Sequence, residues 1–420
     1  MSLPATHQAP AGRPARPLPP VGVLGGGQLG SMLADAAGRL GLDVTIAIDD
    51  PLAPAALGRH RLVVGPLGSS GTLAALARHA RLVTWESENA DLSHVPAAEL
   101  AFGLGFAPGP AAMAVLQDKL RQKALLEELG IDSARYDGWD GRSPADGWLA
   151  RVLETFGPRA VLKWARHGYD GRGVMVLRGA AADRAAALAF VRAAARRDVA
   201  VYAEAHVPFR RELSLVVTRT AHGTVAAYPL VISTQERGVC DRVIGPATAF
   251  GVPARFEAAA CAIARRIGER LDLVGTYAVE FFEDRTDRLL VNEIAPRVHN
   301  TGHWTLDAGV TSQFENHWRA LLGLRLGPTR PAGAFAMLNL LGPADVNEDA
   351  TRLAPPTVSR GAHLHWYGKS RVRPGRKMGH VNLTAPDAET LRARLAEADR
   401  ERQAWYRAIS VPPVRAEAAA

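Results

Sequence analysis

The stretch Asn292-Glu293-Ile294-Ala295-Pro296-Arg297-Val298-His299-Asn300-Thr301-Gly302-His303-Trp304 is the most informative part of this chain. It follows an apolar run at residues 289–291 and sets a carboxylate at the end of a candidate β-strand. An arginine, two histidines and an asparagine then share one loop, which is more chemistry than a plain connection needs. The stretch therefore predicts a binding or catalytic site at the end of a strand.

A second candidate strand, residues 275–282, lies just upstream and is joined to the first by a turn-like segment. In a hairpin whose turn is centred on residues 286–287, Glu280 and Glu293 would face each other. Opposed like charges destabilise a sheet unless something neutralises them. Magnesium takes oxygen ligands and commonly arrives with nucleotide phosphates. The alternative is one glutamate fraying at each strand end, but the functional groups that follow Glu293 favour a site.

Composition describes an ordinary globular protein. With 420 residues, 47% hydrophobic and 22% charged, the chain is long enough for two or three domains. No apolar run reaches the length of a membrane span. Residues 1–20 are rich in Pro and Ala without a secretory apolar core, so we expect a disordered leader. Two cysteines are too few for a disulfide framework, which predicts a cytoplasmic protein.

The net charge of +8 raises the question of a polyanionic partner. The arginines are spread through amphipathic segments such as residues 183–197 and are mixed with acids. A single-strand binder would need a basic stripe interleaved with aromatic side chains, which the sequence lacks. We expect no nucleic acid and no membrane as partners, because small phosphorylated substrates account for local basic clusters equally well.

Residues 21–117 alternate candidate strands and helices, which predicts a parallel α/β domain. Its first strand runs into Gly25-Gly26-Gly27-Gln28-Leu29-Gly30 and a helix, the form of a dinucleotide fingerprint. With Asp49 near the ribose-binding distance, this turn alone would suggest a nicotinamide dehydrogenase. Any phosphate or ribose at a helix N-terminus asks for the same glycines, and so does a tight connection without ligand. The ligand stays open.

The remaining chain divides into two further domains and a tail. Residues 118–327 carry a small strand-and-helix lid subdomain at about 130–205, followed by a larger antiparallel unit. Residues 328–413 read as short strands and turns, a small β-rich domain, and residues 414–420 as a disordered tail.

A glycine loop, His167-Gly168-Tyr169-Asp170-Gly171-Arg172-Gly173, lies between two candidate strands shortly after Lys163. Glycines that turn backbone N–H groups toward one anion, beside cations, form a phosphate cradle of the lid-like kind. The loop does not match the P-loop pattern. A hairpin turn would explain two of its glycines but not the whole set.

Several charged residues have a plain surface alternative. Lys119 fits a solvated helix face, whereas Lys163 closes an apolar strand, where a cation needs a partner. Glu204 and Glu212 are ribose-binding candidates that would otherwise be surface acids. Glu86 and its neighbour Glu88 follow a strand of the parallel sheet, the edge at which such sheets bind ligands.

Residues 363–380 concentrate cations beside glycine and proline turns. A basic run is usually solvated, but the fixed turns favour a pocket for a phosphate monoester, which arginine binds in bidentate fashion.

Taken together, these motifs resemble the ATP-grasp superfamily and, within it, the N5-carboxyaminoimidazole ribonucleotide synthetases. The resemblance runs from Val21 to the region of Leu383. It rests on the segments 25–30, 168–173, 292–304, 363–367 and 373–380, which occur in the family's order. It implies an ATP-grasp fold with an N-terminal Rossmann-like α/β domain and a small C-terminal β-rich domain.

The resemblance also implies an activity: carboxylation of 5-aminoimidazole ribonucleotide, with ATP and bicarbonate, in purine biosynthesis. Magnesium, or manganese in its place, would accompany ATP. A homodimer and a functional hand-off to the N5-carboxyaminoimidazole ribonucleotide mutase follow from the same resemblance. The alternative within the superfamily is a formate-dependent glycinamide ribonucleotide transformylase.

Site residues follow from the resemblance position by position. Those implied for ATP are Lys119, Lys163, Gly168, Tyr169, Asp170, Gly171, Arg172, Gly173, Glu204, Ala205, His206, Val207, Glu212, Asn292 and Glu293. Those implied for the metal are Glu280, Glu293 and Asn292. Those implied in catalysis are Arg297, His299 and Asn300 for bicarbonate, with Tyr169 and Asp170. Those implied for the ribonucleotide are Gln28, Leu29, Glu86, Lys369, Arg376 and Lys377.

Three positions depart from the family pattern. His167 stands where glycine is frequent, Lys119 where arginine is common, and Gln235 where many members carry histidine.

Overall fold

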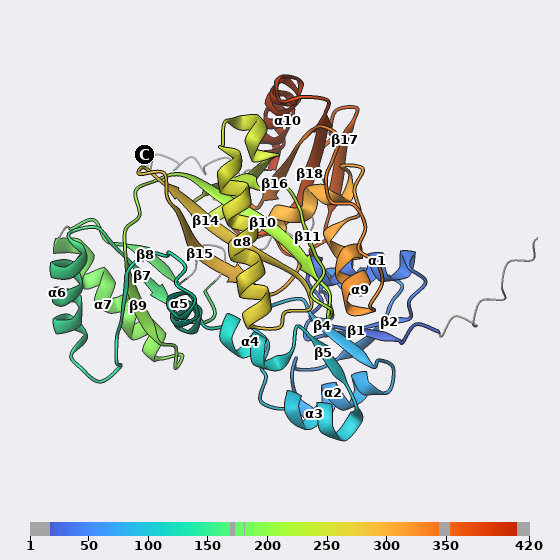
Figure 1. Cartoon of the computed structure of the whole chain (residues 1–420), viewed down its shortest axis with the longest axis horizontal. Helices are drawn as coiled ribbons and strands as arrows, with labels where there is room; N and C mark the ends of the chain where they lie inside the picture. Colours follow the sequence, from blue (N-terminus) through green and yellow to red (C-terminus); the bar gives the residue numbers. More distant parts are fainter. Residues whose placement is uncertain (1–16, 169–172, 180, 344–352, 410–420) are drawn as a thin grey trace, which may run out of the picture.

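The structure is a computed structural model that describes residues 17–168, 173–179, 181–343 and 353–409. Three sheets organise the chain (Figure 1): an N-terminal sheet in blue and cyan, a small sheet in green, and a large sheet running from yellow-green to red. None of the helices in these ranges combines the length and apolarity that crossing a bilayer requires.

The N-terminal domain is a five-stranded sheet in the order β3-β2-β1-β4-β5, with every strand pair parallel. Its strands are β1 (Val21–Leu24), β2 (Val44–Ile48), β3 (Arg61–Val64), β4 (Leu82–Trp85) and β5 (Gly105–Ala107). Its helices are α1 (Gln28–Arg39), α2 (Ser70–Ala77) and α3 (Val95–Phe102), with the 3-10 turn η1 (Pro54–Leu57). β1 and β2 are buried along their whole length, as expected for strands covered on both faces. The predicted parallel α/β domain is confirmed.

A small antiparallel sheet, in the order β6-β9-β7-β8, forms the second unit. Its strands are β6 (Tyr136–Gly138), β7 (Ala160–Trp164), β8 (Val174–Val176) and β9 (Val201–Ala205). Helices α6 (Ala145–Phe156) and α7 (Ala181–Ala195) pack apolar side chains on one face, and helix α5 (Lys119–Glu128) lies beside it (Figure 1). Helix α4 (Pro110–Leu116) connects this unit to the N-terminal domain.

The large sheet has nine strands, and its main path is β15-β14-β10-β12-β13-β16-β18-β17. Its first six strands in chain order are β10 (Phe209–Arg219), β11 (Val225–Ala227), β12 (Val231–Glu236), β13 (Val239–Gly245), β14 (Gly275–Asp284) and β15 (Leu289–Ala295). Helix α8 (Ala254–Arg270) packs across β10 and β14, with the 3-10 turn η2 (Ala247–Phe250) before it. Helix α9 (Gln313–Leu321) packs Phe314 and Trp318 into the core beneath α1, which joins the first domain to this sheet.

The C-terminal strands continue the large sheet, because β16 (Ala334–Leu341) pairs with β13. β17 (Ala362–Trp366) and β18 (Lys377–Ala385) follow, and helix α10 (Ala388–Ile409) packs on β16 and β18. The short strands and turns expected after Ala334 are therefore a partial description. The eight-residue β16 is buried throughout, and the 22-residue α10 ends the described chain.

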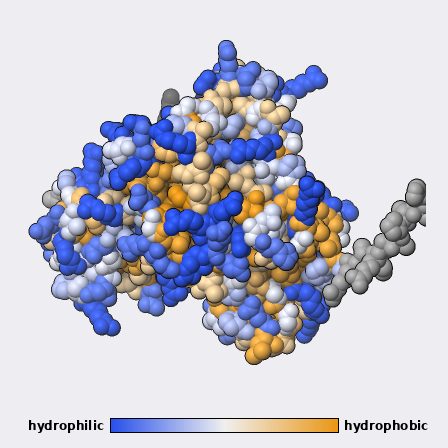
Figure 2. Space-filling model, viewed as in Figure 1, coloured by the Kyte–Doolittle hydropathy of each residue, from blue (hydrophilic) through white to orange (hydrophobic). Residues whose placement is uncertain are grey.

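Polar and charged groups are spread over the face in Figure 2, with an apolar patch at its lower end near α3. Leu100 and Phe102 of α3 are among the exposed large apolar side chains.

Candidate functional site

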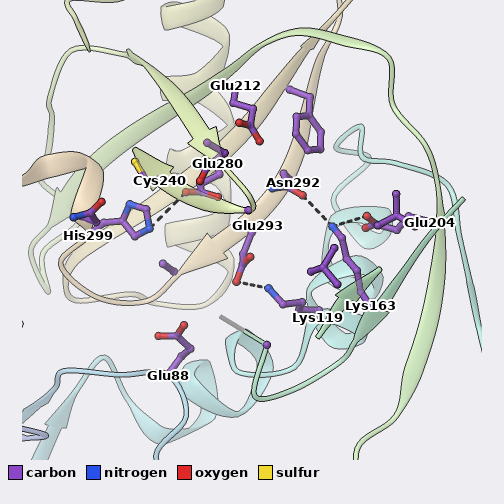
Figure 3. Close-up of a pocket in the computed structure, with 18 of the residues that line it drawn as sticks. Glu88, Lys119, Lys163, Glu204, Glu212, Cys240, Glu280, Asn292, Glu293 and His299 are labelled. Atoms are coloured by element: carbon purple, nitrogen blue, oxygen red, sulfur yellow. Dashed lines mark hydrogen bonds and ion pairs between the residues drawn. The ribbon is translucent and has the colours of Figure 1, made fainter. Parts of the chain in front are cut away.

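A cleft of about 920 Å³ lies among the three sheets. Figure 3 shows the charged side chains that converge in it. The N-terminal sheet contributes Glu86 and Glu88, the small sheet Lys163 and Glu204, and the large sheet Glu280. Because three separately folded elements meet here, the cleft combines groups that lie far apart in the sequence.

One wall of the cleft, called the acidic wall below, is the β14–β15 hairpin, in which Glu280 pairs with Glu293 as predicted. The register then shifts, because Phe281 pairs with Val291 and leaves Asn292 as an extra residue. A bulge of this kind re-aims side chains. Asn292 and Glu293 both line the cleft although they are consecutive, whereas an unbroken strand would send them to opposite faces.

This hairpin concentrates negative charge. Burial and the neighbouring Glu293 and Glu212 carboxylates raise the pKa of Glu280 to about 7. Burial also raises the pKa of Glu212, on the adjacent strand β10, to about 7. Lys119 forms an ion pair with Glu293, and His299 lies 3.6 Å from Glu280. The three acids are therefore only partly compensated by the protein.

The opposite wall, called the basic wall below, is formed by the small sheet around Lys163 and Glu204 and carries an excess of positive charge. The Glu204 carboxylate is buried between two ammonium groups, with Lys123 Nζ at 2.6 Å from one oxygen and Lys163 Nζ at 2.6 Å from the other. Lys163 also donates to Asn292 Oδ1 at 3.1 Å, which joins the small sheet to the hairpin. Lys163 has the partner that its position on an apolar strand requires. The surface alternative for Glu204 is wrong, because its side chain is 4% exposed.

The loop after β15 is held from two sides. Arg297 donates both arms of its guanidinium to Glu88, with Nη2 to Oε1 at 3.0 Å, which ties the loop to the N-terminal domain. Burial would raise the pKa of Glu88, but Arg297 outweighs it and lowers the pKa to about 2. Burial, with the charges of Arg297 and Lys377 nearby, lowers the pKa of His299 to about 3. The His299 imidazole is neutral at ordinary pH.

Amide side chains fix the next turn of this loop. Asn300 and Asn339 exchange a reciprocal pair of hydrogen bonds, at 3.1 and 2.8 Å. Gln313 accepts from the backbone N–H of His299 at 2.8 Å and donates to its carbonyl at 2.7 Å. Part of the segment that reads as an irregular loop in sequence is thus the 3-10 helix η3 (Asn300–Leu306), held by side-chain hydrogen bonds.

The glycine turn of the N-terminal domain has an occupant of its own. Glu86 accepts from the backbone N–H of Gly27 at 2.7 Å and sits at the start of α1. A Cβ on Gly27 would lie 2.0 Å from Glu86 Oε1, which explains the glycine. The place that the pyrophosphate of a dinucleotide would take is held by a carboxylate. This argues against the dehydrogenase alternative.

Models of three protein domains match the chain. The ribonucleotide synthetase preATP-grasp domain matches residues 18–117, and the ATP-grasp domain matches residues 124–314. The phosphoribosylaminoimidazole carboxylase C-terminal domain matches residues 336–394.

Similar proteins agree with these domains. The N5-carboxyaminoimidazole ribonucleotide synthase of Synechococcus elongatus is 38% identical over 385 residues, 91% of this chain and 93% of that protein. The crystal structure of the synthetase from Thermus thermophilus has a TM-score of 0.78 and 38% identity, covering 94% of this chain and 99% of that one. The synthase of Aspergillus clavatus, solved with ADP and 5-aminoimidazole ribonucleotide, has a TM-score of 0.78 and 29% identity, covering 92% and 99%.

This chain belongs to the N5-carboxyaminoimidazole ribonucleotide synthase family. The predicted ATP-grasp fold is confirmed, with its Rossmann-like N-terminal domain and its C-terminal domain. These relatives support the synthase activity over the transformylase alternative.

Most residues implied by the family resemblance line the cleft. They are Gln28, Leu29, Glu86, Lys119, Lys163, Gly168, Glu204, Ala205, His206, Val207, Glu212, Glu280, Asn292, Glu293, Arg297, His299, Asn300 and Lys377. Tyr169, Asp170, Gly171 and Arg172 lie outside the described residues. His167, where the family often has glycine, adopts φ 61, a left-handed conformation that glycine takes without strain.

Three residues implied by the resemblance are not on the cleft wall. Gly173 packs against the Trp164 side chain, since a Cβ there would lie 3.1 Å from it. Lys369 donates to the Lys377 carbonyl at 2.7 Å, and Arg376 donates to the Arg371 carbonyl at 2.7 Å. Lys377, whose carbonyl accepts from Lys369 and which follows Arg376 in the chain, does line the cleft.

Sequence reasoning missed several residues that hold the predicted ones, Lys123 and Asn339 among them. Lys123 reads as one more charge on a polar helix, and Asn339 as one residue of an apolar strand. Their partners, Glu204 and Asn300, are distant in sequence, so no local pattern could have revealed them.

Proposed function

We propose that this protein uses ATP and bicarbonate to carboxylate the exocyclic amine of 5-aminoimidazole ribonucleotide. One observation carries the proposal within this family. A single cleft combines a surplus of cations around Lys163 with a surplus of carboxylates at Glu280 and Glu293. A triphosphate with its divalent ion complements both walls at once.

The nucleotide would lie between the small sheet and the β14–β15 hairpin. Lys119, Lys163 and the glycine loop would contact its phosphates, since backbone N–H groups and ammonium groups both suit phosphate oxygens. Residues 205–207 and Glu212 would contact the adenosine, and Glu204 would hold Lys163 beside the phosphates. Val174, Val176 and Phe209, partly exposed on the cleft wall, offer an apolar surface for a base.

Glu280 and Glu293, with Asn292 beside them, have the oxygen donors that magnesium or manganese prefers. Among the residues that the structure describes, no group of three or more His, Cys, Asp or Glu side chains is placed to hold a metal ion. Two carboxylates and one amide would fill only part of the coordination sphere of the ion, and the nucleotide phosphates would supply further oxygen ligands. When bound, the ion would offset phosphate charge during phosphoryl transfer.

The reaction would begin with attack of a bicarbonate oxygen on the γ-phosphorus of ATP. The bond to the bridging oxygen breaks, which releases ADP and forms carboxyphosphate. The carboxyphosphate C–O bond then breaks to give carbon dioxide and phosphate, and the amine attacks the carbon. Its proton leaves to the freed phosphate or to Asp170. Arg297, His299 and Asn300 would position bicarbonate, and the closed cleft would keep water from the intermediate.

The ribonucleotide would lie against the N-terminal domain, near Glu86 and the turn at Gln28 and Leu29. Lys369, Arg376 and Lys377 would bind its phosphate. We expect Arg376→Ala to raise the KM for ribonucleotide about tenfold with little change in kcat, because one charge-assisted contact is lost. Arg373→Ala, an exposed charge on the same segment, is the matched control. Equal KM values for the two variants would move the phosphate site elsewhere.

Release of ADP tests the whole proposal. It should depend on both 5-aminoimidazole ribonucleotide and bicarbonate, and should not occur with glycinamide ribonucleotide and formate. ADP release that ignores the aminoimidazole substrate would overturn the assignment. The same proposal includes a cytoplasmic homodimer that passes its product to the mutase, which sedimentation and coupled assays can test.

A further inference from the structure

Lys123 lies behind the cleft and does not line it. It is on helix α5, and its side chain is 3% exposed. An ammonium group is almost never fully buried unless it is paired, and it carries a desolvation cost wherever it is. Burial lowers the pKa of Lys123, and the neighbouring charge of Lys163 adds to that effect. A buried lysine at this cost calls for a reason beyond packing.

Its partner is a carboxylate that already has a cation. Lys123 Nζ lies 2.6 Å from Glu204 Oε1, while Lys163 Nζ lies 2.6 Å from Glu204 Oε2. The Lys123 ammonium also donates to the Ala134 carbonyl at 3.3 Å and lies over the Tyr136 ring, 6.0 Å from its centroid. Two ammonium groups thus share one acid, and the trio carries a net charge of +1.

Without Lys123, that balance would change. Glu204 would then face Lys163 alone, and the pair would be neutral. Of the two lysines, Lys163 is the one that lines the cleft, and it contacts Asn292 of the β14–β15 hairpin. A neutral pair would offer an incoming polyphosphate much less attraction than a trio with a spare positive charge.

We propose that Lys123 is a positioning residue for nucleotide binding. Its ammonium group pairs with one oxygen of the Glu204 carboxylate and neutralises that acid, so the charge of Lys163 remains available to the phosphates of ATP. The inference rests on the proposed function in one respect only, namely that ATP binds beside Lys163. It adds a role for a residue that touches no substrate.

Charge arithmetic supplies the test. Lys123→Met removes the second cation and should weaken ATP binding at least tenfold, the loss expected for one interaction with a charged group. Glu204→Gln in the same chain removes the acid that would otherwise neutralise Lys163. The double variant should return the ATP affinity to within threefold of the parent protein. A purely structural role for Lys123 predicts the opposite, since the double variant would be as damaged as the single one.

ATP affinity is measured by calorimetry without bicarbonate or ribonucleotide, and melting temperatures are recorded alongside. Arg121→Met is the matched control, because it removes an exposed positive charge from the same helix. An affinity of Lys123→Met within threefold of the parent, or a double variant that is not restored, overturns the inference. If Lys123→Met does not fold, Lys123→Gln decides, because it keeps a polar side chain beside Glu204 and the Ala134 carbonyl but removes the charge: a loss of ATP affinity of tenfold or more supports the inference, and affinity within threefold of the parent overturns it. Because ATP binding is titrated directly, a protein that binds ATP but carboxylates nothing refutes the proposed function without refuting this role.

Discussion

Glu204 and Glu280 are the same residue type in the same cleft, the first buried and the second partly exposed, yet the protein treats their charges in opposite ways. Burial opposes ionisation of both. Lys163 and Lys123 outweigh it at Glu204 and lower the pKa of that carboxyl, whereas Glu293 and Glu212 add to it at Glu280, whose pKa rises to about 7. Figure 3 shows the two groups on facing walls, with Lys163 between Glu204 and Asn292.

The comparison teaches that a carboxylate's neighbours decide whether it is a structural or a ligand-binding group. Glu204 is already satisfied and serves to hold two lysines. Glu280 and Glu293 are opposed by the hairpin register and repel each other, which stores unfavourable charge until a cation arrives. Under the proposed function, the wall with Lys163 suits the phosphates and the wall with Glu280 and Glu293 suits their divalent ion.

The largest effect should come from breaking the acidic wall. Glu293→Gln keeps the shape of the side chain and removes one of the two opposed charges. We expect kcat for ADP release to fall by roughly 10²- to 10³-fold, as when one preorganised electrostatic group is lost from an active site. Glu315→Gln, at a helix surface where Glu315 pairs with Arg319, is the control and should be near normal. Near-normal turnover of Glu293→Gln at ordinary magnesium would remove Glu293 from the metal site.

A second test sharpens the comparison through stability. The pKa of Glu280 is raised from 4.5 to about 7, so the unfolded chain releases this proton first as pH rises. The group therefore costs no stability below pH 4.5, costs progressively more between pH 4.5 and 7, and reaches its full cost above pH 7. Because the side chain is 25% exposed, that full cost is about 2 kcal/mol.

Glu280→Gln should remove this dependence. The difference in unfolding free energy between variant and parent should grow in the variant's favour from pH 4.5 to 7 and then level off. Taking the difference cancels the contribution of His299, whose lowered pKa acts in the opposite direction below pH 6.5. Denaturant titrations across this range measure it, and a flat difference would show that Glu280 is not strained by its neighbours.

The acidic wall could be predicted from sequence because its geometry is local. Strand alternation and one short turn set the register of residues 275–295, and both glutamates lie in that window. The parallel domain was predictable for the same reason, since each strand is followed closely by its own helix. Resemblance then supplied roles for the loop residues that follow.

The basic wall depends on contacts that no short window contains. Lys123 and Glu204 come from different elements, and Glu88 meets Arg297 across 209 positions. The β12–β13 hairpin was missed although its turn is local, because a register shift between Thr234 and Gln235 breaks the alternation along β12. α10 was missed as well, since its apolar positions are few among many charges. Long-range pairing and tertiary burial decide these features, and propensity does not encode them.

The smallest effect is expected at Glu212, which lies between the acidic wall and the basic wall. Glu212 lies on β10, contributes to the raised pKa of Glu280, and feels the charge of Lys163. Glu212→Gln should raise the KM for ATP about threefold, near the lower end for an ordinary hydrogen bond, and leave kcat nearly unchanged. It should also shift the midpoint of the Glu280 stability curve to lower pH, since one repelling charge is gone. Steady-state kinetics and the same denaturant titrations provide both readouts. A fall in kcat as large as that of Glu293→Gln would place Glu212 among the metal-binding acids and move the boundary between the walls.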